Sequence, residues 1–408
     1  MAKTKNTKAF YNTEIPSDWK ICKLGDCCLA KGEYGINAPA VEFSDDLPTY
    51  LRITDIDDNG NYSTDKKVSV DDLNYKQFVL KDGDIVFART GATVGKTYLY
   101  KPTDGMLVFA GFLIRFRTEE KLLIPQHLKY FTEVKFYWDW VKTVSMRSGQ
   151  PGINAEEYAS LKIPLPPLPE QKAIVRVLST WDTAIHKTQQ LISQKELRKK
   201  WLMQNLLTGK MKLKGFGGEW KETYLGEMFT ERNETKCVDL PLLSIGQNGV
   251  YPQDESDKKD TSNKDKSKYK RICPGDIGYN TMRMWQGRSA LSQLEGIVSP
   301  AYTVVIPKKN ADSVFFSYLF KTSKMTNLFW RNSQGLVDDT LNCKFKDFCI
   351  VKTILPQTKQ EQTVIAQVLQ SADNEVNLLK AKAEKLRKQK KGLMQQLLTG
   401  KKRLKVEL

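Results

Sequence analysis

Side chains that can bind phosphates or base edges gather in two glycine-containing loops of the sequence. Both loops follow a Gly-Asp-Ile motif, GDIVFA in one case and GDIGY in the other. Cationic loop 1 (89–96) carries Arg89, Thr90 and Lys96, and cationic loop 2 (280–288) carries Asn280, Arg283, Trp285 and Arg288. Because arginine and lysine neutralise phosphates, and arginine and asparagine make bidentate hydrogen bonds to bases, we predict that both loops contact DNA.

A second pair of polar segments follows two aromatic stretches of the sequence. The first segment, MRSGQPGIN, carries Arg147 and Gln150, and the second, WRNSQGL, carries Arg331, Asn332 and Gln334. Arginine suits a guanine edge, and asparagine and glutamine suit an adenine edge. Solvated turn residues are the alternative interpretation for each of these side chains.

Motifs for catalysis are incomplete in this sequence. The loop GATVGKT has three residues between its glycines, whereas a phosphate-binding Walker loop needs four. A nuclease-like spacing of Asp104, Glu119 and Lys121 is short and does not recur in the second half of the chain. Two histidines, His127 and His186, leave no histidine triad or His-rich metal site, and no motif for methyl transfer to a flipped base occurs. We predict no catalytic residue and no metal ligand.

The composition also favours a nucleic-acid partner. The chain has 408 residues, and 64 Lys+Arg less 47 Asp+Glu give a formal charge of +17. Such an excess attracts nucleic acid first and an anionic membrane surface second. The sequence has no apolar run of about 18 residues and no apolar leader, and its seven cysteines form no CxxC pair. We expect a cytoplasmic protein with no membrane span and at least two domains.

An internal repeat shows which elements must position these loops. Residues 170–210 align with residues 361–401 at a constant offset of 191, and 16 of the 41 positions are identical. Both copies begin with Glu-Gln and close with LLTGK. An alignment of this length without gaps indicates that both copies keep the same geometry.

Each copy of the repeat has the apolar spacing of a long helix. The seam is apolar in the second copy, interrupted only by Lys390, and has polar residues in the middle of the first. About 40 residues give a rod of roughly 60 Å. We expect the two helices to pack on each other as a coiled coil, with two ordinary bundle helices as the alternative. The predicted seam residues are Ile174, Leu178, Trp181, Ile185, Leu202 and Leu206, and Ile365, Leu369, Val376, Leu379, Leu386, Leu393 and Leu397.

Two blocks of similar size remain outside the helices. Module 1 (1–168) and module 2 (213–358) share an early Trp-Lys and Leu-Gly pair, at Trp19 and Leu24 in one and at Trp220 and Leu225 in the other. Both mix short β-type runs with one aromatic helical stretch. We predict an α/β (α+β) fold in which two similar modules alternate with two long helices.

This order of modules and helices resembles the DNA-specificity (S) subunits of type I restriction-modification systems. The motifs that carry the resemblance are PLPPLPEQKAIV and LPQTKQEQTVIA before the helices, LLTGK after each, and GDIVFARTGATVGKT and GDIGYNTMRMWQG in the modules. Together they cover nearly the whole chain. The second copy departs from the usual Pro-Leu-Pro form by Leu355-Pro356-Gln357 and an inserted spacing before Glu361.

The resemblance implies a subunit that reads DNA and is not catalytic by itself. Target-recognition domains 1–168 and 213–358 would each bind one half of a split target, and a central helix (169–210) and a C-terminal helix (359–404) would pair antiparallel as a spacer. It also implies two methyltransferase subunits that bind S-adenosylmethionine and two motor-nuclease subunits that use ATP and Mg²⁺. This chain is expected to hold no cofactor.

Two other functions remain open from the sequence. The first is a stand-alone DNA-binding regulator or architectural protein that uses the same two modules. The second is a self-contained nuclease or methyltransferase, against which the missing motifs argue.

Half-sites on one face of B-DNA should lie about 34–36 Å apart, a separation that a rod with a module near each end can set.

Overall fold

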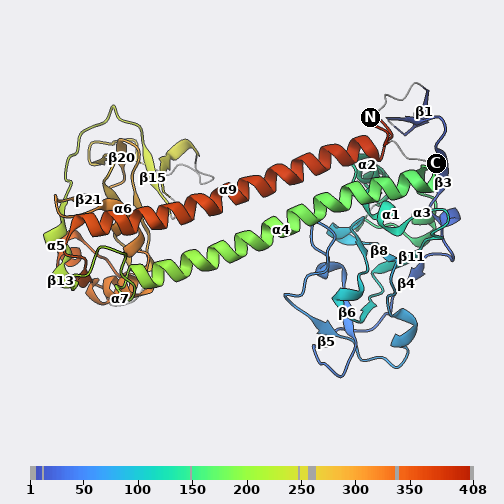
Figure 1. Cartoon of the computed structure of the whole chain (residues 1–408), viewed down its shortest axis with the longest axis horizontal. Coiled ribbons are helices and arrows are strands. Elements are labelled where there is room, and N and C mark those ends of the chain that lie inside the picture. Colours follow the sequence, from blue (N-terminus) through green and yellow to red (C-terminus); the bar gives the residue numbers. More distant parts are fainter. Residues whose placement is uncertain are drawn as a thin grey trace. The chain divides into compact units, whose positions relative to one another are not determined.

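A computed structural model describes residues 6–11, 13–147, 149–246, 249–255, 263–335 and 340–404 of the chain (Figure 1). The chain forms two compact units. Unit 1 comprises Met1–Thr188 with Lys382–Leu408, and unit 2 comprises Gln189–Ala381. Each unit therefore contains one module, the start of one long helix and the end of the other.

The centre of module 1 is an antiparallel sheet with strand order β4-β11-β8-β9. Strand β8 (Asp84–Ala88) is buried along its whole length and pairs with β11 from Leu113↔Ala88 to Arg117↔Asp84. Apolar β-branched and aromatic side chains favour such a buried strand. A second sheet has the order β10-β6-β7-β5, and β1 with β2 and β3 with β12 form two-stranded ladders.

The remaining elements of module 1 have the following bounds. The strands are β1 (Thr7–Phe10), β2 (Thr13–Pro16), β3 (Lys20–Lys23), β4 (Glu33–Tyr34), β5 (Val41–Glu42), β6 (Thr49–Leu51), β7 (Val68–Ser69), β9 (Thr97–Leu99), β10 (Leu107–Phe109), β11 (Leu113–Arg117) and β12 (Lys162–Leu165). The helices are α1 (Pro125–Phe131), α2 (Lys135–Val144) and α3 (Ala155–Ala159).

Module 2 repeats the central sheet of module 1, with strand order β14-β21-β18-β19 and antiparallel pairing throughout. Its strands are β13 (Lys221–Tyr224), β14 (Phe229–Glu231), β15 (Leu243–Ile245), β16 (Val250–Pro252), β17 (Lys270–Ile272), β18 (Ile277–Asn280), β19 (Ser289–Leu291), β20 (Gly296–Val298), β21 (Tyr302–Pro307) and β22 (Lys352–Leu355). Its helices are α5 (Leu225–Met228), α6 (Ser313–Leu319), α7 (Ser323–Asn332) and α8 (Phe345–Cys349).

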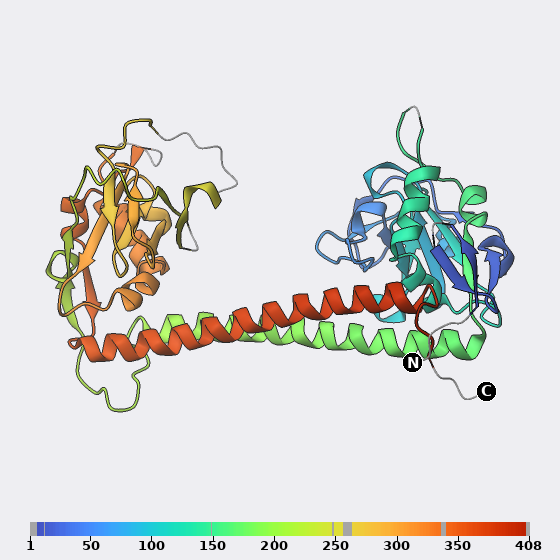
Figure 2. The ribbon, with the colours of Figure 1, turned by 90° about the horizontal axis from the view of Figure 1, so that it is seen from above.

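The two long helices are α4 (Leu168–Leu206) and α9 (Lys359–Leu397), each of 39 residues. They end before the predicted limits of 210 and 404, because Gly209 and Gly400 take positive φ values of 71° and 67° just past the helix ends. In both units α4 and α9 lie side by side and antiparallel (Figure 2). The predicted mixed fold with two packed long helices is therefore confirmed.

The core of each module includes side chains from both long helices. In module 1, Ile174 and Leu178 of α4 join Leu397 of α9 in one buried cluster. In module 2, Leu206 of α4 joins Ile365 and Leu369 of α9. Leu393 and Leu202 pack at the edges of these two clusters. The ends of the predicted seam thus belong to the module cores.

The other predicted seam residues lie between these ends. Val376 is buried, at 5% exposure, and the rest are half-buried: Trp181, Ile185, Leu379 and Leu386. Lys195 of α4 forms an ion pair with Glu375 of α9, with Nζ and Oε1 2.5 Å apart. The middle of the rod is therefore less apolar than its two ends, which fits the polar middle of the first copy.

Candidate nucleic-acid interface

The structure brings cationic loop 1 together with the segment around Gln150. Thr90 forms a β-bridge with Gly152, and the Gly91 N–H donates to the Pro151 carbonyl at 3.0 Å. Gly91 has a φ of +72°, and a Cβ there would lie 3.0 Å from the Gln150 Nε2. Two groups of residues that the sequence placed about 60 positions apart thus form one surface of module 1.

Arg89 lies at the base of this loop, next to two aromatic rings. Its guanidinium carbon is 5.1 Å from the ring centroid of Tyr34 and 5.9 Å from that of Phe112. The Arg89 N–H donates to the Phe112 carbonyl at 3.0 Å, and the Arg89 carbonyl accepts the Ile153 N–H at 2.8 Å. Both backbone groups of Arg89 are therefore hydrogen-bonded, whereas its side chain lies near two aromatic rings.

Three of the other predicted contacts of module 1, Lys96, Arg147 and Thr90, have protein partners. Lys96 Nζ forms an ion pair with Asp58 Oδ1 at 2.6 Å. Arg147 pairs with Glu157, which also closes a capping box with Asn154 at the start of α3. The Thr90 hydroxyl donates weakly to the Pro151 carbonyl at 3.4 Å, and Gln150 is exposed.

Cationic loop 2 connects β18 to β19 through a short 3₁₀ helix, Met284–Gln286. The Asn280 side-chain oxygen accepts the Met282 N–H at 3.0 Å, and the Trp285 indole N–H donates to the Met282 carbonyl at 3.1 Å. These bonds shape the loop from within. Arg283 precedes the short helix and is half-buried, whereas Arg288 is exposed and forms no ion pair with any described carboxylate.

The segment after α7 lies beside cationic loop 2. The Cys343 N–H donates to the Thr281 carbonyl at 2.8 Å, which matches the bond from Ile153 to Arg89 in module 1. Arg331 is exposed in the last turn of α7, Asn332 Nδ2 donates to the Leu328 carbonyl at 2.9 Å, and Gln334 forms a β-bridge with Asn342. Each module thus joins its cationic loop to the segment that follows its aromatic helices.

A buried aspartate explains the Gly-Asp-Ile motif before each loop. The Asp84 carboxylate accepts the Lys81 N–H at 2.9 Å and binds Arg117 Nε at 2.7 Å. In module 2 the Asp276 carboxylate accepts the Cys273 N–H at 2.8 Å and binds Arg232 Nε at 2.7 Å. The carboxylate raises the pKa of each of these two guanidinium groups through a side-chain hydrogen bond, the largest cause in both cases.

Module–helix joints connect the modules to the long helices. The Trp19 indole N–H donates to Glu170 Oε2 at 3.1 Å, and the Trp220 indole N–H donates to Glu361 Oε1 at 2.9 Å. Glu170 and Glu361 occupy the same position in the two copies of the repeat. The prediction of DNA contacts did not assign these residues a role, although the shared Trp-Lys and Glu-Gln pairs were the available signal.

The glutamines that follow these glutamates bind the modules as well. Gln171 Oε1 accepts the Ile124 N–H just before α1 at 3.0 Å, and Gln362 Oε1 accepts the Asp312 N–H just before α6 at 2.9 Å. At the joint of module 1, Arg403 Nε also pairs with Glu170 Oε1 at 2.6 Å. Arg403 lies after α9, so this joint holds the start of α4 and the chain beyond α9 together.

A lysine in each long helix completes a polar cluster beside its module. In unit 1, Lys390 Nζ is 2.7 Å from Asp182 Oδ1, and the Tyr130 hydroxyl donates to the same carboxylate at 2.7 Å. In unit 2, Lys199 pairs with Asp373, which accepts the Tyr318 hydroxyl. Burial, followed by the aspartate, raises the pKa of both tyrosines. Lys390, which interrupts the apolar seam, is therefore half of a salt bridge between helices.

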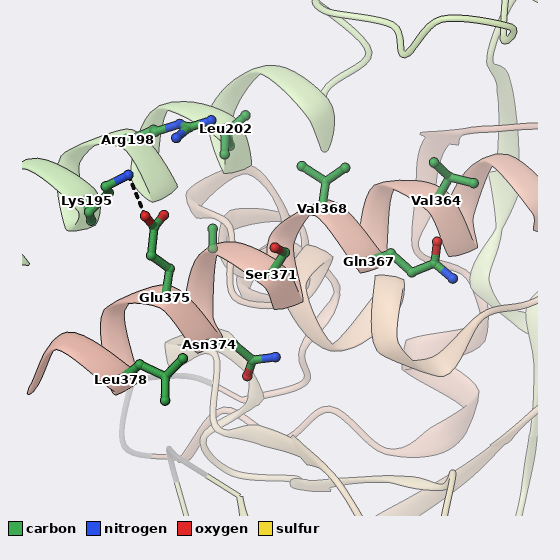
Figure 3. Close-up of a pocket in the computed structure, with 11 residues that line it drawn as sticks. Lys195, Arg198, Leu202, Val364, Gln367, Val368, Ser371, Asn374, Glu375 and Leu378 are labelled. Atoms are coloured by element: carbon green, nitrogen blue, oxygen red, sulfur yellow. Dashed lines mark ion pairs between the residues drawn. The ribbon is translucent and has the colours of Figure 1, made fainter. Parts of the chain in front are cut away.

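An apolar groove lies along α4 and α9 in unit 2 (Figure 3). Leu202, Val364, Val368 and Leu378 line it together with the Lys195–Glu375 ion pair. Leu378 is 72% exposed.

In the described ranges, no helix has the length and apolarity to cross a membrane, and no group of His, Cys, Asp and Glu side chains has the arrangement of a metal site.

Known proteins share the sequence features of this chain. A family model described as "Type I restriction modification DNA specificity domain" matches residues 16–194. The specificity subunit of the type I restriction enzyme MjaVIII from Methanocaldococcus jannaschii is 24% identical over 440 residues, covering 99% of this chain and 97% of that protein. The EcoBI specificity subunit from Escherichia coli is 25% identical over 170 residues, or 41% of this chain and 35% of that protein.

Solved structures share the fold of this chain. The HsdS subunit from Thermoanaerobacter tengcongensis has a TM-score of 0.51 and 17% identity, with 96% of this chain and 99% of that chain covered. The type I restriction-modification S subunit from M. genitalium has a TM-score of 0.56 and 14% identity, with 96% and 98% covered. At these identities the likeness concerns the fold.

Proposed function

Because the chain belongs to the family of type I restriction-modification specificity subunits, we propose that modules 1 and 2 each read one half of a bipartite DNA target. The proposal rests on one observation: the same arrangement of strand, cationic loop and second polar segment occurs in both modules. In each module a buried aspartate lies at the start of a strand, as the first residue of β8 and directly before β18, and a cationic loop follows that strand. A backbone hydrogen bond joins each loop to a second polar segment. Two equivalent cationic surfaces suit two half-sites on one duplex.

We propose that the long helices set the distance between the half-sites. Each helix has 39 residues and is therefore about 58 Å long. The module–helix joints support this role, because Trp19 and Trp220 bind glutamates at equivalent positions of α4 and α9. A module tied to a fixed point of a helix keeps its orientation when the duplex binds.

A specificity subunit is not itself the catalyst, so methylation and cleavage require partner subunits. We propose two methyltransferase subunits that bind S-adenosylmethionine, and two motor-nuclease subunits that use ATP and Mg²⁺. The apolar groove of unit 2 supports docking of a methyltransferase on the helices, since exposed apolar side chains are typical of interfaces. The comparisons do not favour the stand-alone regulator considered above.

Exchange of module 2 tests the proposal. Residues 213–358 are replaced by the corresponding module of another specificity subunit, and the chain is expressed with its methyltransferase. Sequencing that detects methylated bases then gives the target motif. We expect one half of the motif to change, while the other half stays as it is in the unexchanged chain.

The exchange has two informative controls. Replacement of module 1 by the same procedure should change the opposite half of the motif. A change in both halves after a single exchange, or in neither half, would contradict the assignment of one half-site to each module.

A further inference from the structure

We propose that Tyr34 and Phe112 are positioning residues that hold the Arg89 guanidinium as a fork for two neighbouring hydrogen-bond acceptors on DNA. This inference deepens the proposed function and rests on it. It concerns module 1 and assigns a role to the two aromatic side chains whose rings lie near the predicted contact.

Arg89 differs from the other arginines of module 1 in its partners. Within the described residues, Arg89 forms no ion pair and its side chain makes no hydrogen bond. Each of the other four arginines pairs with a carboxylate: Arg52 with Asp55, Arg115 with Glu33, Arg117 with Asp84, and Arg147 with Glu157. These four guanidinium groups thus have carboxylate partners within the module, whereas Arg89 has none among the described residues.

The rings shield one part of the Arg89 side chain from water. Arg89 Nε is buried and has no hydrogen-bond partner. A buried donor without a partner costs free energy, which contact with aromatic faces offsets only in part. Nη1 and Nη2 are not among the buried unpartnered atoms, and Arg89 as a whole is half-buried, so these donors are not fully enclosed. A bound acceptor on DNA would therefore gain from a guanidinium whose plane is already set.

Both rings are anchored by elements outside cationic loop 1. Tyr34 lies in β4 opposite Ile114 of β11, and its hydroxyl accepts the Ala155 N–H at 3.1 Å. Phe112 comes directly before β11, and its carbonyl accepts the Arg89 N–H at 3.0 Å. The rings thus depend on the sheet and on α3, so they can restrict the side chain of a loop residue.

The exposure of these rings fits an interface. Tyr34 is 42% exposed and Phe112 is 52% exposed. A planar guanidinium gives two parallel N–H bonds, which match guanine O6 and N7 or two oxygens of one phosphate. Both acceptors belong to the same duplex and share this chemistry, and the measurements below distinguish them.

The test compares variants that remove a ring with variants that keep it. Tyr34→Leu and Phe112→Leu remove a ring, Phe112→Tyr and Tyr34→Phe keep one, and Arg89→Lys removes the fork. Phe43→Leu is the matched control, because Phe43 is 39% exposed and its ring centroid lies 5.6 Å from Lys67 Nζ. Phe43 is not one of the two rings near Arg89. Circular dichroism and thermal unfolding of each full-length variant check the fold.

Two measurements identify the acceptor. Selection of duplexes from a random-sequence pool with the full-length chain gives the bound motif, and anisotropy with a labelled mixed-sequence duplex gives the salt dependence of binding. If the acceptor is guanine, Arg89→Lys and both Leu variants should lose preference at the same base position, by roughly 5- to 150-fold. If it is a phosphate, the same three variants should weaken binding to all duplexes without a change in base preference, and the salt slope should stay nearly the same because none of them removes a positive charge.

Several results would overturn the inference. The ring proposal fails if Arg89→Lys changes binding but Tyr34→Leu and Phe112→Leu do not, or if Phe112→Tyr and Tyr34→Phe lose as much as the Leu variants. It also fails if Phe43→Leu has the same effect. A wild-type chain that selects no bipartite motif would instead contradict the proposed function, so the two failures can be told apart.

Discussion

Lys96 and Arg147 form ion pairs with Asp58 and Glu157, and these pairs would have to open if the two cations bind DNA as predicted. The Asp58 side chain beside Lys96 is 94% exposed, and the Arg147 side chain beside Glu157 is 42% exposed. Exposed pairs contribute only about 0–1 kcal/mol, so a DNA phosphate can replace either carboxylate at small cost. Both residues therefore remain predicted contacts, although Arg89 needs no such exchange.

The burial of His127 predicts that the free energy of unfolding of unit 1 depends on pH. Burial lowers the pKa of His127 from 6.5 to about 4. The unfolded chain therefore takes up a proton more readily than the folded one, and stability is lost as the pH falls from about 6.5 through 4. The loss is on the order of 3 kcal/mol at its limit. Urea unfolding of the wild type and of His127→Leu across this range measures it.

The comparison of variants isolates the effect of this side chain. His127→Leu should remove the part of the acid slope that burial of the imidazole causes, while carboxylates contribute equally in both proteins. His186 is exposed on α4, and His186→Leu should keep the wild-type slope. Equal slopes for wild type and His127→Leu would contradict the prediction.

The module–helix joints attach each module to a long helix through a glutamate of that helix. Glu170 is buried, at 3% exposure, and receives hydrogen bonds from both Trp19 and Arg403. Arg403 is 26% exposed and also pairs with Asp18. A buried carboxylate is costly without such partners. The joint thus connects the start of α4 to the chain that follows α9.

Removal of Arg403 should destabilise unit 1. Arg403→Met leaves the Glu170 carboxylate buried with the Trp19 indole as its side-chain donor, and we expect a loss of about 3 kcal/mol in unfolding free energy. Arg387→Met is the matched control, since Arg387 is 41% exposed and lies 3.6 Å from Glu384. That variant should lose less than about 1 kcal/mol. Equal losses in urea unfolding would show that the joint does not stabilise the unit.

Salt bridges within the rod limit how α4 and α9 can slide. Lys390 pairs with Asp182, and Lys199 pairs with Asp373, so each helix supplies one lysine and one aspartate at equivalent positions. Polar pairs inside an apolar seam specify the register of a coiled coil at some cost in stability. The tyrosines of α1 and α6 bind the same aspartates, which links this register to the modules.

At the scale of the whole molecule, the length of the helices should decide the spacing of the DNA half-sites. Deletion of residues 186–192 and 381–387 removes one heptad from each helix and retains Asp182, Lys199, Asp373 and Lys390. The helices shorten by about 10 Å, which equals about three base pairs of B-DNA. Selection from duplexes with varied spacers should therefore yield a shorter preferred spacer.

The half-site sequences supply the internal control for this deletion. They should not change, because both cationic loops lie outside the deleted segments. Deletion of residues 186–192 alone should impair binding to every spacer, since the helices then lose their register. An unchanged spacer preference after the double deletion would refute the role of the helices as a ruler.

The sequence by itself determined the order of the elements and the resemblance to specificity subunits. Helix periodicity and the repeat at an offset of 191 depend on residues close together in the chain, and so does the Gly-Asp-Ile motif before each loop. The glycines at positions 209 and 400 likewise predict the helix ends, because left-handed backbone favours glycine. The predicted DNA contacts stay predictions, although the structure brings the two segments that carry them into contact in each module.

Only the tertiary structure decided which side chains meet across the chain. The Trp19–Glu170 bond joins residues 151 positions apart, and Arg403 meets Glu170 across 233 positions. Periodicity could not divide the seam into module cores and a polar middle, because the same apolar spacing serves both. The partners of Lys96, Arg147 and Arg89 likewise follow from packing between distant segments, and no local pattern of charges reveals which cation has no carboxylate beside it.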